Sequence, residues 1–520
     1  MRKTARTFSM RQPEIALALT IVCAGLGSCA TSSLDMAPTR PDKPWTPPTQ
    51  ANGEIVPGAK PQPAPSSSYV LPSNAELADP PPPLLVRQDK SYALPELIDI
   101  AETNNPVTRT AWNAARNVAL AEGIAESTYL PRLSASVITG YQTSNGQNTA
   151  LGFNLGSAGE NAHGTIAVIS LEWLLFDFGE RNALIEAAKQ ASVISNIAFT
   201  AAHQQVIYDV SVAFYQNAAA RERLQTAQQS LRNAQRVQAA AEDRYKHGIG
   251  TVVETAQARQ STAQAQLILV QSSGASTDAY LKLISAMGIS PLTQIKIASV
   301  GGRRLSAPMY DSVEHIIREA LARRPDVLSA FAAQKASEAN IKAAEAEFLP
   351  KFFLTGNGAY NNGSLDVTAI PAVGQQLPTV NLTNNQLNAT VLAGVTVPLY
   401  DGGTRLAALK QAQATADNAN LALLRTRDEA VRQIVLADNA LHTSLAAYSA
   451  SVQLAAAAQT TFDAALAAYR NGVGSITDAT LAETQLLQAE NARSDAYSTA
   501  LSAAATLALA AGALGSVPEQ

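Results

Sequence analysis

The stretch YKHGIGTVVETAQARQ (Tyr245–Gln260) returns 224 residues later as YRNGVGSITDATLAETQ (Tyr469–Gln485). Each copy has a tyrosine, two polar residues, a glycine, a β-branched residue, a second glycine and a hydroxyl residue, with an acid three positions further on. Glycine readily adopts the left-handed backbone that ends a helix, and a hydroxyl residue followed by an acid is typical of a helix N-terminus. The pattern therefore predicts the tip of a helical hairpin, present twice.

The two predicted tips share a capping arrangement. Thr251 can cap the helix that follows, with Glu254 at the third helical position, and Ser475 and Asp478 repeat this arrangement. We expect one of the two glycines in each copy to turn the chain. The GxG spacing is not a nucleotide-binding fingerprint, because it follows a helix rather than a strand and lacks a third glycine.

The duplication extends over most of the chain. NNPVTRTAWNAARNVALAEGIAESTYLP (104–131) matches RRPDVLSAFAAQKASEANIKAAEAEFLP (323–350), and WLLFDFGER (173–181) matches VPLYDGGTR (397–405). The first pair is offset by 219 residues and the second by 224, so the second copy has five more residues in the intervening loop. Landmarks that recur in one order indicate an internal duplication.

A long helix leads to each predicted tip. Between Gly179 and Tyr245 the sequence contains neither glycine nor proline, and at about 1.5 Å per residue this run would span roughly 100 Å. Apolar residues spaced by threes and fours indicate coiled-coil packing. The helix between Pro106 and Pro131, added to the helix that returns from the tip, nearly equals the long run. We therefore expect two shorter helices to lie end to end beside one long helix.

Alternating stretches adjoin the other end of each long helix. In TIAVISLEWLLF (165–176) one face is apolar, and its counterparts recur in the second copy. The two predicted faces consist of Ala167, Ile169, Leu171, Trp173 and Leu175, and of Val391, Ala393, Val395, Val397 and Leu399. This period of two describes a strand between lipid and water, although a soluble β-sandwich would also explain one strand pair. Four strands cannot close a barrel in lipid alone, so subunits would have to share one barrel.

The landmarks predict five segments: a lipoprotein signal peptide (1–28), an acylated Pro-rich tether (29–91), a first structural repeat (92–300), a second (301–512) and a C-terminal tail (513–520). In the first repeat we expect strands at about 132–143 and 165–176, a long helix at 179–246 and a return helix at 251–289. In the second we expect strands at about 351–360 and 389–400, a long helix at 403–470 and a return helix at 475–512.

The N-terminus has the order of a targeting signal. Basic residues precede an apolar run (Ile15–Leu26) that is too short to be a stable membrane anchor. LGSC (26–29) then resembles a bacterial lipobox, in which Cys29 would become the lipidated first residue; an ordinary signal peptide with a chance cysteine is the alternative. Because the only other cysteine, Cys23, lies in the signal, the mature chain could form neither an internal disulfide nor a cysteine-based metal site.

Composition and motifs exclude several classes of function. The formal net charge is -4, which gives a nucleic-acid partner no electrostatic support. The five histidines are scattered, and the sequence has no HExxH, GxSxG or Walker motif. We therefore expect no catalytic residue, no metal site and no cofactor.

With its duplicated NNP/RRP…LP, DxGxR and YxxG landmarks, the chain resembles the TolC family of outer-membrane efflux proteins, in the NodT- and OprM-like lipoprotein branch, over roughly 92–512. The resemblance implies a mainly α fold with a small β part. It implies a homotrimer with a twelve-stranded transmembrane β-barrel, continued by a long periplasmic α-helical barrel and lipid-anchored in the outer membrane. Such ducts receive cargo from an inner-membrane pump, RND-type or ATP-driven, through a periplasmic membrane-fusion adaptor.

The resemblance also assigns roles at the tips. It places a periplasmic constriction at Tyr469 and Asp478, and Glu254 joins it as the equivalent of Asp478 in the first repeat. It assigns adaptor docking to the hairpin tips, which contain Tyr245, Gly248, Gly250, Thr251, Gly472, Gly474 and Ser475. Gly474 stands where TolC has a gate arginine, and Leu481 replaces a second acid, so a looser gate is expected.

Three functions remain open from the sequence. The first is the exit duct of a tripartite efflux system. The second is the outer-membrane duct of a type I protein secretion system, which uses the same fold. The third is a lipid-tethered periplasmic coiled-coil scaffold without a pore, against which the strand pairs argue.

Overall fold

The computed structural model describes residues 32–38, 40–42, 44–61, 69–87, 89–150, 153–300, 305, 313–363 and 387–515. The chain divides into two compact units between Pro83 and Leu84. The expected signal peptide (1–28) and the expected lipidation site, Cys29, lie outside the described residues.

Turns and hydrogen bonds between distant residues hold the described part of the first unit; Asn52 Nδ2, for example, donates to Glu76 Oε1 at 2.9 Å. In its described residues the regular elements are two short 3-10 helices, η1 (Ser32–Met36) and η2 (Ala75–Leu77), and an isolated bridge between Thr49 and Ile55. The Trp45 indole N–H donates to the Met36 carbonyl at 3.2 Å. The sequence of this unit is rich in proline, which has no N–H to donate to a helix or sheet, so turns predominate among its described residues.

The second unit begins at Leu84, within the segment 29–91 that the sequence predicts as a tether. The Leu84 N–H donates to Thr293 Oγ1 at 3.0 Å, and β1 (Ser91–Tyr92) pairs in parallel with β4 (Lys296–Ile297). The proline run ends at Pro83, so every residue from Leu84 to Tyr92 has an N–H available for such bonds.

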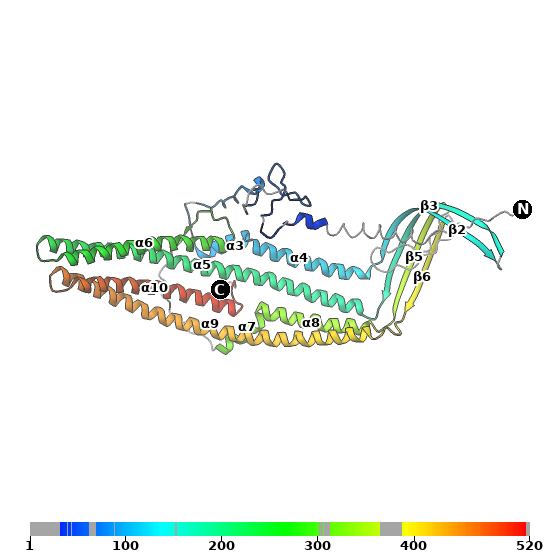
Figure 1. Ribbon diagram of the computed structural model, residues 1–520. Helices are drawn as coiled ribbons and strands as arrows, with labels where there is room; N and C mark the ends of the chain where they lie inside the picture. Colours follow the sequence, from blue (N-terminus) through cyan, green and yellow to red (C-terminus); the bar gives the residue numbers. More distant parts are fainter. Residues whose placement is uncertain are drawn as a thin grey trace. The chain divides into compact units, whose positions relative to one another are not determined.

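The second unit contains the two repeats (Figure 1). The helices of the first are α3 (Leu94–Asn104), α4 (Pro106–Glu126), followed by η3 (Ser127–Tyr129), α5 (Glu180–Lys246) and α6 (Val252–Ala286). Those of the second are α7 (Val313–Arg323), α8 (Pro325–Ala346), α9 (Thr404–Arg470) and α10 (Ile476–Ala510). The return helices α6 and α10 end before the expected 289 and 512, because Gly288 and Gly512 adopt left-handed φ of 71° and 63°.

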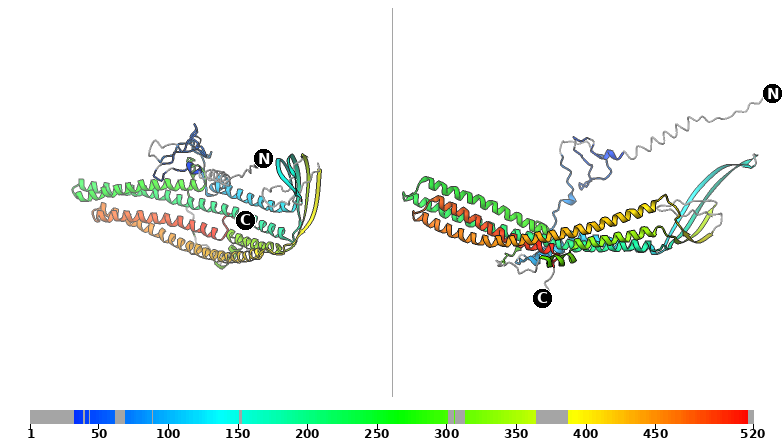
Figure 2. Two further views of the ribbon diagram at one scale, coloured as in Figure 1. Left: turned by 45° about the vertical axis from the view of Figure 1, so that its right-hand side comes forward. Right: turned by 90° about the horizontal axis from the view of Figure 1, so that it is seen from below.

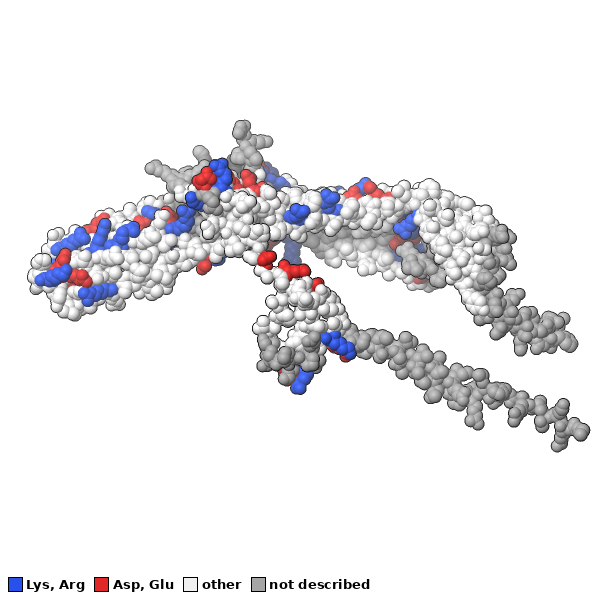
Figure 3. Space-filling view, turned by 90° about the horizontal axis from the view of Figure 1, so that it is seen from above, with Lys and Arg blue, Asp and Glu red and all other residues white. Residues whose placement is uncertain are grey.

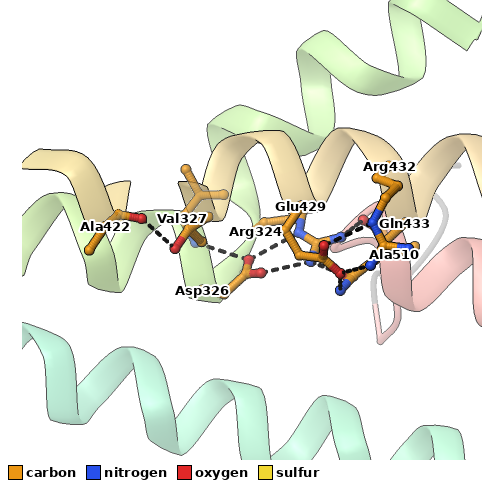
Figure 4. A network of polar contacts seen from close by, with 9 residues as sticks. Arg324, Asp326, Val327, Ala422, Glu429, Arg432, Gln433 and Ala510 are labelled. Carbon is orange, nitrogen blue, oxygen red and sulfur yellow. Dashed lines mark hydrogen bonds and ion pairs between the residues drawn. The ribbon is translucent and has the colours of Figure 1, made fainter. Parts of the chain in front are cut away.

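The expected end-to-end stacking of the short helices is confirmed. In Figures 1 and 2, α6 and α4 follow one another along α5, and α10 and α8 follow one another along α9. Asn105 makes the first joint, because it caps α4 and its Nδ2 donates to the Ala286 carbonyl at 3.0 Å. Arg324 makes the second joint, where its Nη1 donates to the Ala510 carbonyl at 2.7 Å (Figure 4).

Helix α5 is central to the second unit, since α4, α6, α8 and α10 all pack against it. Its buried stripe includes Val206, Val210, Ala213, Ala227 and Ala234, and these follow the three-and-four spacing read from the sequence. Two apolar clusters repeat the same pattern, one around Val210 and Leu283 and the other around Ile434 and Leu507. No helix in the described ranges is both long enough and apolar enough to cross a membrane.

Four antiparallel strands form one sheet at the end of the unit opposite the tips, in the order β2-β3-β5-β6. Their bounds are β2 (Arg132–Ala150), β3 (Phe153–Phe176), β5 (Lys351–Gly363) and β6 (Leu387–Thr396). The first three extend beyond the expected ends into the glycine- and asparagine-rich loops. Strand β6 ends four residues before the expected 400, because Pro398 lacks the N–H that a strand needs.

One face of the sheet is apolar and exposed. The register aligns Val137 with Ala167 and Tyr360, and Leu133 with Leu171 and Gly356. Exposed side chains on this face are Leu133, Val137, Tyr141, Ile169, Tyr360, Leu387, Val391 and Val395. Charged residues occur in the four strands only at Arg132, Glu160, Glu172 and Lys351. In Figure 3 the described surface over the strands is accordingly white, whereas charged side chains gather over the helices.

Candidate functional site

The two hairpin tips have the same backbone. Gly248 and Gly472 follow the long helices with φ of 72° and 79°, the left-handed region that ends a helix. The second glycine of each tip has a different function, because its backbone lies against the last helical turn. A Cβ on Gly250 would lie 2.8 Å from the Tyr245 nitrogen, and one on Gly474 would lie 3.0 Å from the Ala468 Cβ. Glycine is therefore needed at both positions of each tip.

Both return helices begin with a capping box. The Glu254 N–H donates to Thr251 Oγ1 at 3.2 Å, and the Thr251 N–H donates to Glu254 Oε2 at 3.4 Å. In the second repeat the Asp478 N–H donates to Ser475 Oγ at 3.1 Å, and the Ser475 hydroxyl donates to Asp478 Oδ2 at 2.7 Å. These acids thus lie in the first turn of the return helices, where the helix dipole also favours a negative charge.

Tyr469 joins the two tips within one chain. Its side chain is 1% exposed, and its hydroxyl donates to Glu254 Oε2 at 3.4 Å. The Arg244 guanidinium lies 5.1 Å from the centre of the Tyr469 ring, and its Nη1 donates to the Tyr469 carbonyl at 3.2 Å. Burial raises the pKa of the Tyr469 hydroxyl, and the nearby Glu254 charge raises it further. The phenol therefore stays protonated and remains a hydrogen-bond donor.

An apolar cluster surrounds this contact. It combines Val237, Ala241 and Ala258 of the first hairpin with residues of the second, namely Phe462, Leu466, Tyr469, Ile476, Ala479, Ala482 and Leu486. Small alanines let the helices approach closely, while Phe462 and Tyr469 fill the remaining volume. The ends of the two hairpins are therefore packed against each other through a dry core, with the Tyr469 hydroxyl at its polar end.

The structure brings together only some of the expected constriction residues. Glu254 and Tyr469 are in contact, whereas Asp478 is exposed and bonded to its own cap, Ser475. The sequence analysis did not identify Arg244, which covers the Tyr469 ring. A comparison of the two repeats could have found it, because its counterpart is Ala468 and a charged residue has been replaced by the smallest helix former.

Further from the tips, the contact between α5 and α10 becomes polar. Ser230 donates to the carboxylate of Glu483, whose side chain is buried, and burial raises the pKa of that carboxyl. Arg223 Nε donates to Asp495 Oδ1 at 2.6 Å on the same pair of helices. The two hairpins are thus joined by an apolar core at the tips and by hydrogen bonds and an ion pair nearer the middle.

The DxGxR landmark forms the elbow between sheet and helix. Asp177 accepts from the backbone N–H of Arg181 at 3.0 Å, and its Oδ2 pairs with Arg181 Nε at 2.8 Å. The same guanidinium donates to the carbonyls of Thr128 and Leu174 at 3.0 and 2.7 Å. One arginine therefore ties the end of the short helix, the end of β3 and the start of α5 together.

Metal ligands are not gathered anywhere in the part of the chain that the structure describes, because no group of three or more His, Cys, Asp or Glu is placed to hold an ion. The described tips offer carboxylates, an arginine, a phenol and small side chains. This arrangement joins helices and presents charge; it does not form a nucleophile with an adjacent base.

Comparisons with known proteins agree with this geometry. The model of the family described as outer membrane efflux protein matches residues 97–289 and 316–513. The chain is 26% identical over 456 residues to protein CyaE of Bordetella pertussis, covering 87% of this chain and 89% of that protein. It is 26% identical over 355 residues to the alkaline protease secretion protein AprF of Pseudomonas aeruginosa, covering 67% and 70%.

Solved structures share the fold. The outer membrane channel CmeC of Campylobacter jejuni superposes with a TM-score of 0.68 at 18% sequence identity, covering 82% of this chain and 87% of that one. The family match covers α3 to α6 and nearly all of the helices and strands of the second repeat. The protein is therefore placed in the outer membrane, and the chain belongs to the outer membrane efflux protein family, whose members are channels rather than enzymes.

Proposed function

We propose that the protein acts as a homotrimer and forms the outer-membrane exit duct of a tripartite efflux system. The observation that carries this proposal is the four-stranded sheet with two open edges, β2 and β6. Backbone N–H and C=O groups cannot remain unpaired in hydrocarbon, so a sheet in lipid must close on itself. Three copies would supply twelve strands, and edge β2 of one copy would pair with edge β6 of the next.

The exposed face of the sheet supports a lipid contact. Tyr141, Val137 and Leu133 of β2 are 68–73% exposed, and Val391 and Leu387 of β6 are 72% and 75% exposed. Apolar side chains that continue across all four strands are unusual on a surface that faces water. The outward band of a membrane barrel requires this pattern, with charges confined to its rims.

The helices would continue the barrel away from the membrane. Each long helix has 67 residues, which corresponds to about 100 Å. Three copies would contribute six hairpins to one tunnel, with the tips at its far end. There the proposed constriction would consist of Glu254, Tyr469 and Asp478.

The tips would dock a periplasmic membrane-fusion adaptor, which links the duct to an inner-membrane pump of the RND type or an ATP-driven type. Val473 and Ile249, the residues between the two glycines of each tip, are 83% and 66% exposed. Because the flanking glycines have no side chains, Val473 and Ile249 are the most prominent side chains of the two turns. They offer apolar contact to the helical ends of an adaptor, with the basic Lys246 and Arg470 beside them.

The proposal is tested by reconstitution. The full-length protein, purified in detergent, should have the mass of a trimer and should conduct ions in planar bilayers. A strain that lacks the gene should accumulate the pump's substrate, and the wild-type gene should restore export. A protein that is monomeric and does not conduct ions would contradict the proposed duct. The lipid-tethered scaffold would then remain as the function.

Docking is tested separately with a substitution that leaves the turn intact. Ile249→Asp places a charge on the exposed first tip but does not alter Gly248 or Gly250. We expect lower export with trimers of normal amount and stability. Leu424→Asp, an exposed residue of α9 far from the tips, is the matched control. Normal export by Ile249→Asp would remove the docking role of the first tip.

We also propose that Cys29 carries lipid and that the acylated segment anchors the chain to the outer membrane. The motif LGSC (26–29) supports this modification. Cys29→Ser should abolish acylation, while the barrel still inserts because a closed barrel is the stronger anchor. Mass spectrometry of the mature N-terminus decides the question, and an unmodified N-terminus contradicts it.

The second candidate is the outer-membrane duct of a type I secretion system. The observation in its favour is the similarity to AprF, whose name is that of an alkaline protease secretion protein. The two candidates differ in cargo and pump. Complementation with an RND pump and its adaptor should restore small-molecule export under the first, whereas release of a protein with an ATP-driven exporter would favour the second.

A further inference from the structure

The first hairpin provides a seat for Tyr469 of the second. Val237 and Ala241 of α5 belong to the apolar cluster around its ring, Arg244 covers the ring, and Glu254 of α6 accepts its hydroxyl. This seat is filled within one chain, since Tyr469 is 1% exposed.

The second hairpin has the same seat, and in the single chain it is an open groove. Adding 224 to the four seat residues gives Thr461, Ala465, Ala468 and Asp478. All four line one groove of about 760 Å³, together with Ala457, Thr460, Ala464, Val473 and Gly474. The duplication therefore produces two equivalent seats, and the chain fills one of them with its own tyrosine.

The side chain that matches the open seat is also present and exposed. Tyr245, the counterpart of Tyr469, is 49% exposed. Val252, the counterpart of Ile476, is 65% exposed, whereas Ile476 is 4% exposed and packed in the tip cluster. The first hairpin thus has an exposed apolar face. The second has an open groove that is equivalent, through the duplication, to the seat of Tyr469.

We propose that Tyr245 of one copy fills this groove on a second copy of the chain, with its hydroxyl donating to Asp478 of that copy. This inference rests on the proposed homotrimer and specifies how its tips meet. Repeated around three copies, the contact joins six hairpins into a closed ring. In this ring the Tyr469–Glu254 contact within a chain alternates with the Tyr245–Asp478 contact between chains.

The charges of the two tips favour this ring. Residues 232–259 of the first hairpin contain five basic and three acidic residues, and the equivalent residues 456–483 of the second contain one basic and three acidic. The hairpins therefore have opposite net charge. In an alternating ring both neighbours of every hairpin have the opposite net charge. The contact between copies is therefore electrostatically attractive, as the contact within a chain is.

The two kinds of contact are nevertheless unequal. Arg244 covers Tyr469 in the filled seat, whereas Ala468 occupies that place in the open seat. The contact between copies lacks both the cation over the ring and the bond from guanidinium to carbonyl. It is therefore the weaker of the two, and the ring should open between copies before it opens within a chain.

Paired cysteines and a short bismaleimide test the contact in the full-length protein. Tyr245→Cys with Asp478→Cys should give covalent dimers and trimers on a denaturing gel. Tyr469→Cys with Glu254→Cys, the matched pair, should consume its thiols and stay at the mass of one chain. The four single-cysteine variants report any linkage through Cys29 or across the symmetry axis, and we expect none.

The outcomes are distinguishable. A trimer by native mass whose 245/478 pair remains at single-chain mass, while the 469/254 pair reacts, overturns the inference and leaves the proposed duct standing. A protein that is not a trimer overturns both. A further variant tests whether the contact between copies is the weaker one. Ala468→Arg supplies the guanidinium that the open seat lacks, so it should strengthen the contact between copies and lower the open probability in planar bilayers. An unchanged open probability would refute the claim that the missing guanidinium makes this contact weaker.

Discussion

Asn105 and Arg324 lie at equivalent joints in the two repeats, and each donates a hydrogen bond to the last carbonyl of a return helix. The Asn105 Nδ2 lies 3.0 Å from the Ala286 oxygen, and the Arg324 Nη1 lies 2.7 Å from the Ala510 oxygen. Each residue also immediately precedes the proline that starts the next helix. Two different side chains thus satisfy one of the four carbonyls that a helix leaves without a partner at its C-terminal end.

The first prediction concerns this joint. Arg324 is buried and also bonds Asp326 and Gln433, as Figure 4 shows, so Arg324→Ala should cost about 2–3 kcal/mol of unfolding free energy. Asn105→Ala removes a helix cap and one bond and should cost about 1–2 kcal/mol. Thermal unfolding of the detergent-solubilised protein measures both.

The matched control for the joint is Arg318→Ala, an exposed arginine on α7. Such a surface substitution should change stability by less than about 0.5 kcal/mol. Equal effects of Arg324→Ala and Arg318→Ala would contradict the role of the joint.

The second prediction concerns the elbow. The Asp177 and Arg181 side chains are 6% and 8% exposed, so Asp177→Asn leaves a buried guanidinium without its counter-charge. Removing one partner of a buried ion pair costs about 3–5 kcal/mol, and we expect less assembled protein and a lower unfolding temperature. Asp401→Asn, at the same place in the second repeat, should cost clearly less because the Asp401 side chain is 32% exposed. The reverse order would contradict this account.

The repeat architecture could be predicted because its signals are local. Gly248 and Gly472 occur where the backbone turns left-handed, and Thr251 and Ser475 occur where the helices begin. Because the long runs contain neither glycine nor proline, the ends of both long helices could be predicted to within one residue. Each of these features depends on neighbours a few residues away, and the second copy repeated the evidence.

The unequal burial of the two tips could not be predicted in the same way. Tyr245 and Tyr469 have nearly the same local sequence, yet one is 49% exposed and the other 1%. The difference arises because only Tyr469 packs into the cluster between the two hairpins of the chain. The ends of the strands and the start of the second unit at Leu84 likewise depend on pairing with distant residues, such as Thr293.

The third prediction concerns pH. Burial raises the pKa of Glu483 above its usual 4.5, and the hydrogen bond from Ser230 offsets only part of this effect. The folded state therefore holds the proton more tightly than the unfolded chain does. This contribution to stability is complete below the unfolded pKa and is lost as the pH rises through the folded pKa. Glu483→Gln, which stays neutral, should become progressively more stable than the wild type as the pH rises.

Unfolding temperatures of both proteins across a pH series measure this difference. Near the unfolded pKa the two should be close, and the gap should widen toward neutral pH. Glu222→Gln, on an exposed position of α5, is the control and should show no such widening. A gap that is constant with pH would mean that the pKa of the Glu483 carboxyl is the same in the folded and the unfolded protein, which would contradict the prediction.

The last prediction concerns ion preference. In the proposed trimer Glu254 and Asp478 supply six carboxylates near the far end of the tunnel, where clustered negative charge attracts cations. The structure distinguishes the two acids, because Arg244 stands over the Tyr469 ring in the seat of Glu254, whereas Ala468 occupies that place in the seat of Asp478 and offsets no charge. Asp478→Asn should therefore reduce cation preference more than Glu254→Gln does, and the double variant should reduce it most.

Reversal potentials in a salt gradient across a planar bilayer measure the preference, and native mass checks that each variant remains a trimer. Asp278→Asn is the control, since it removes one exposed carboxylate from α6 well away from the tip. Both amides keep an oxygen that can accept the capping hydrogen bond, so the return helices should still begin at the same residues. If the reversal potential of the double variant equals that of the wild type, the two acids do not contribute to the ion preference, which must then come from another part of the tunnel.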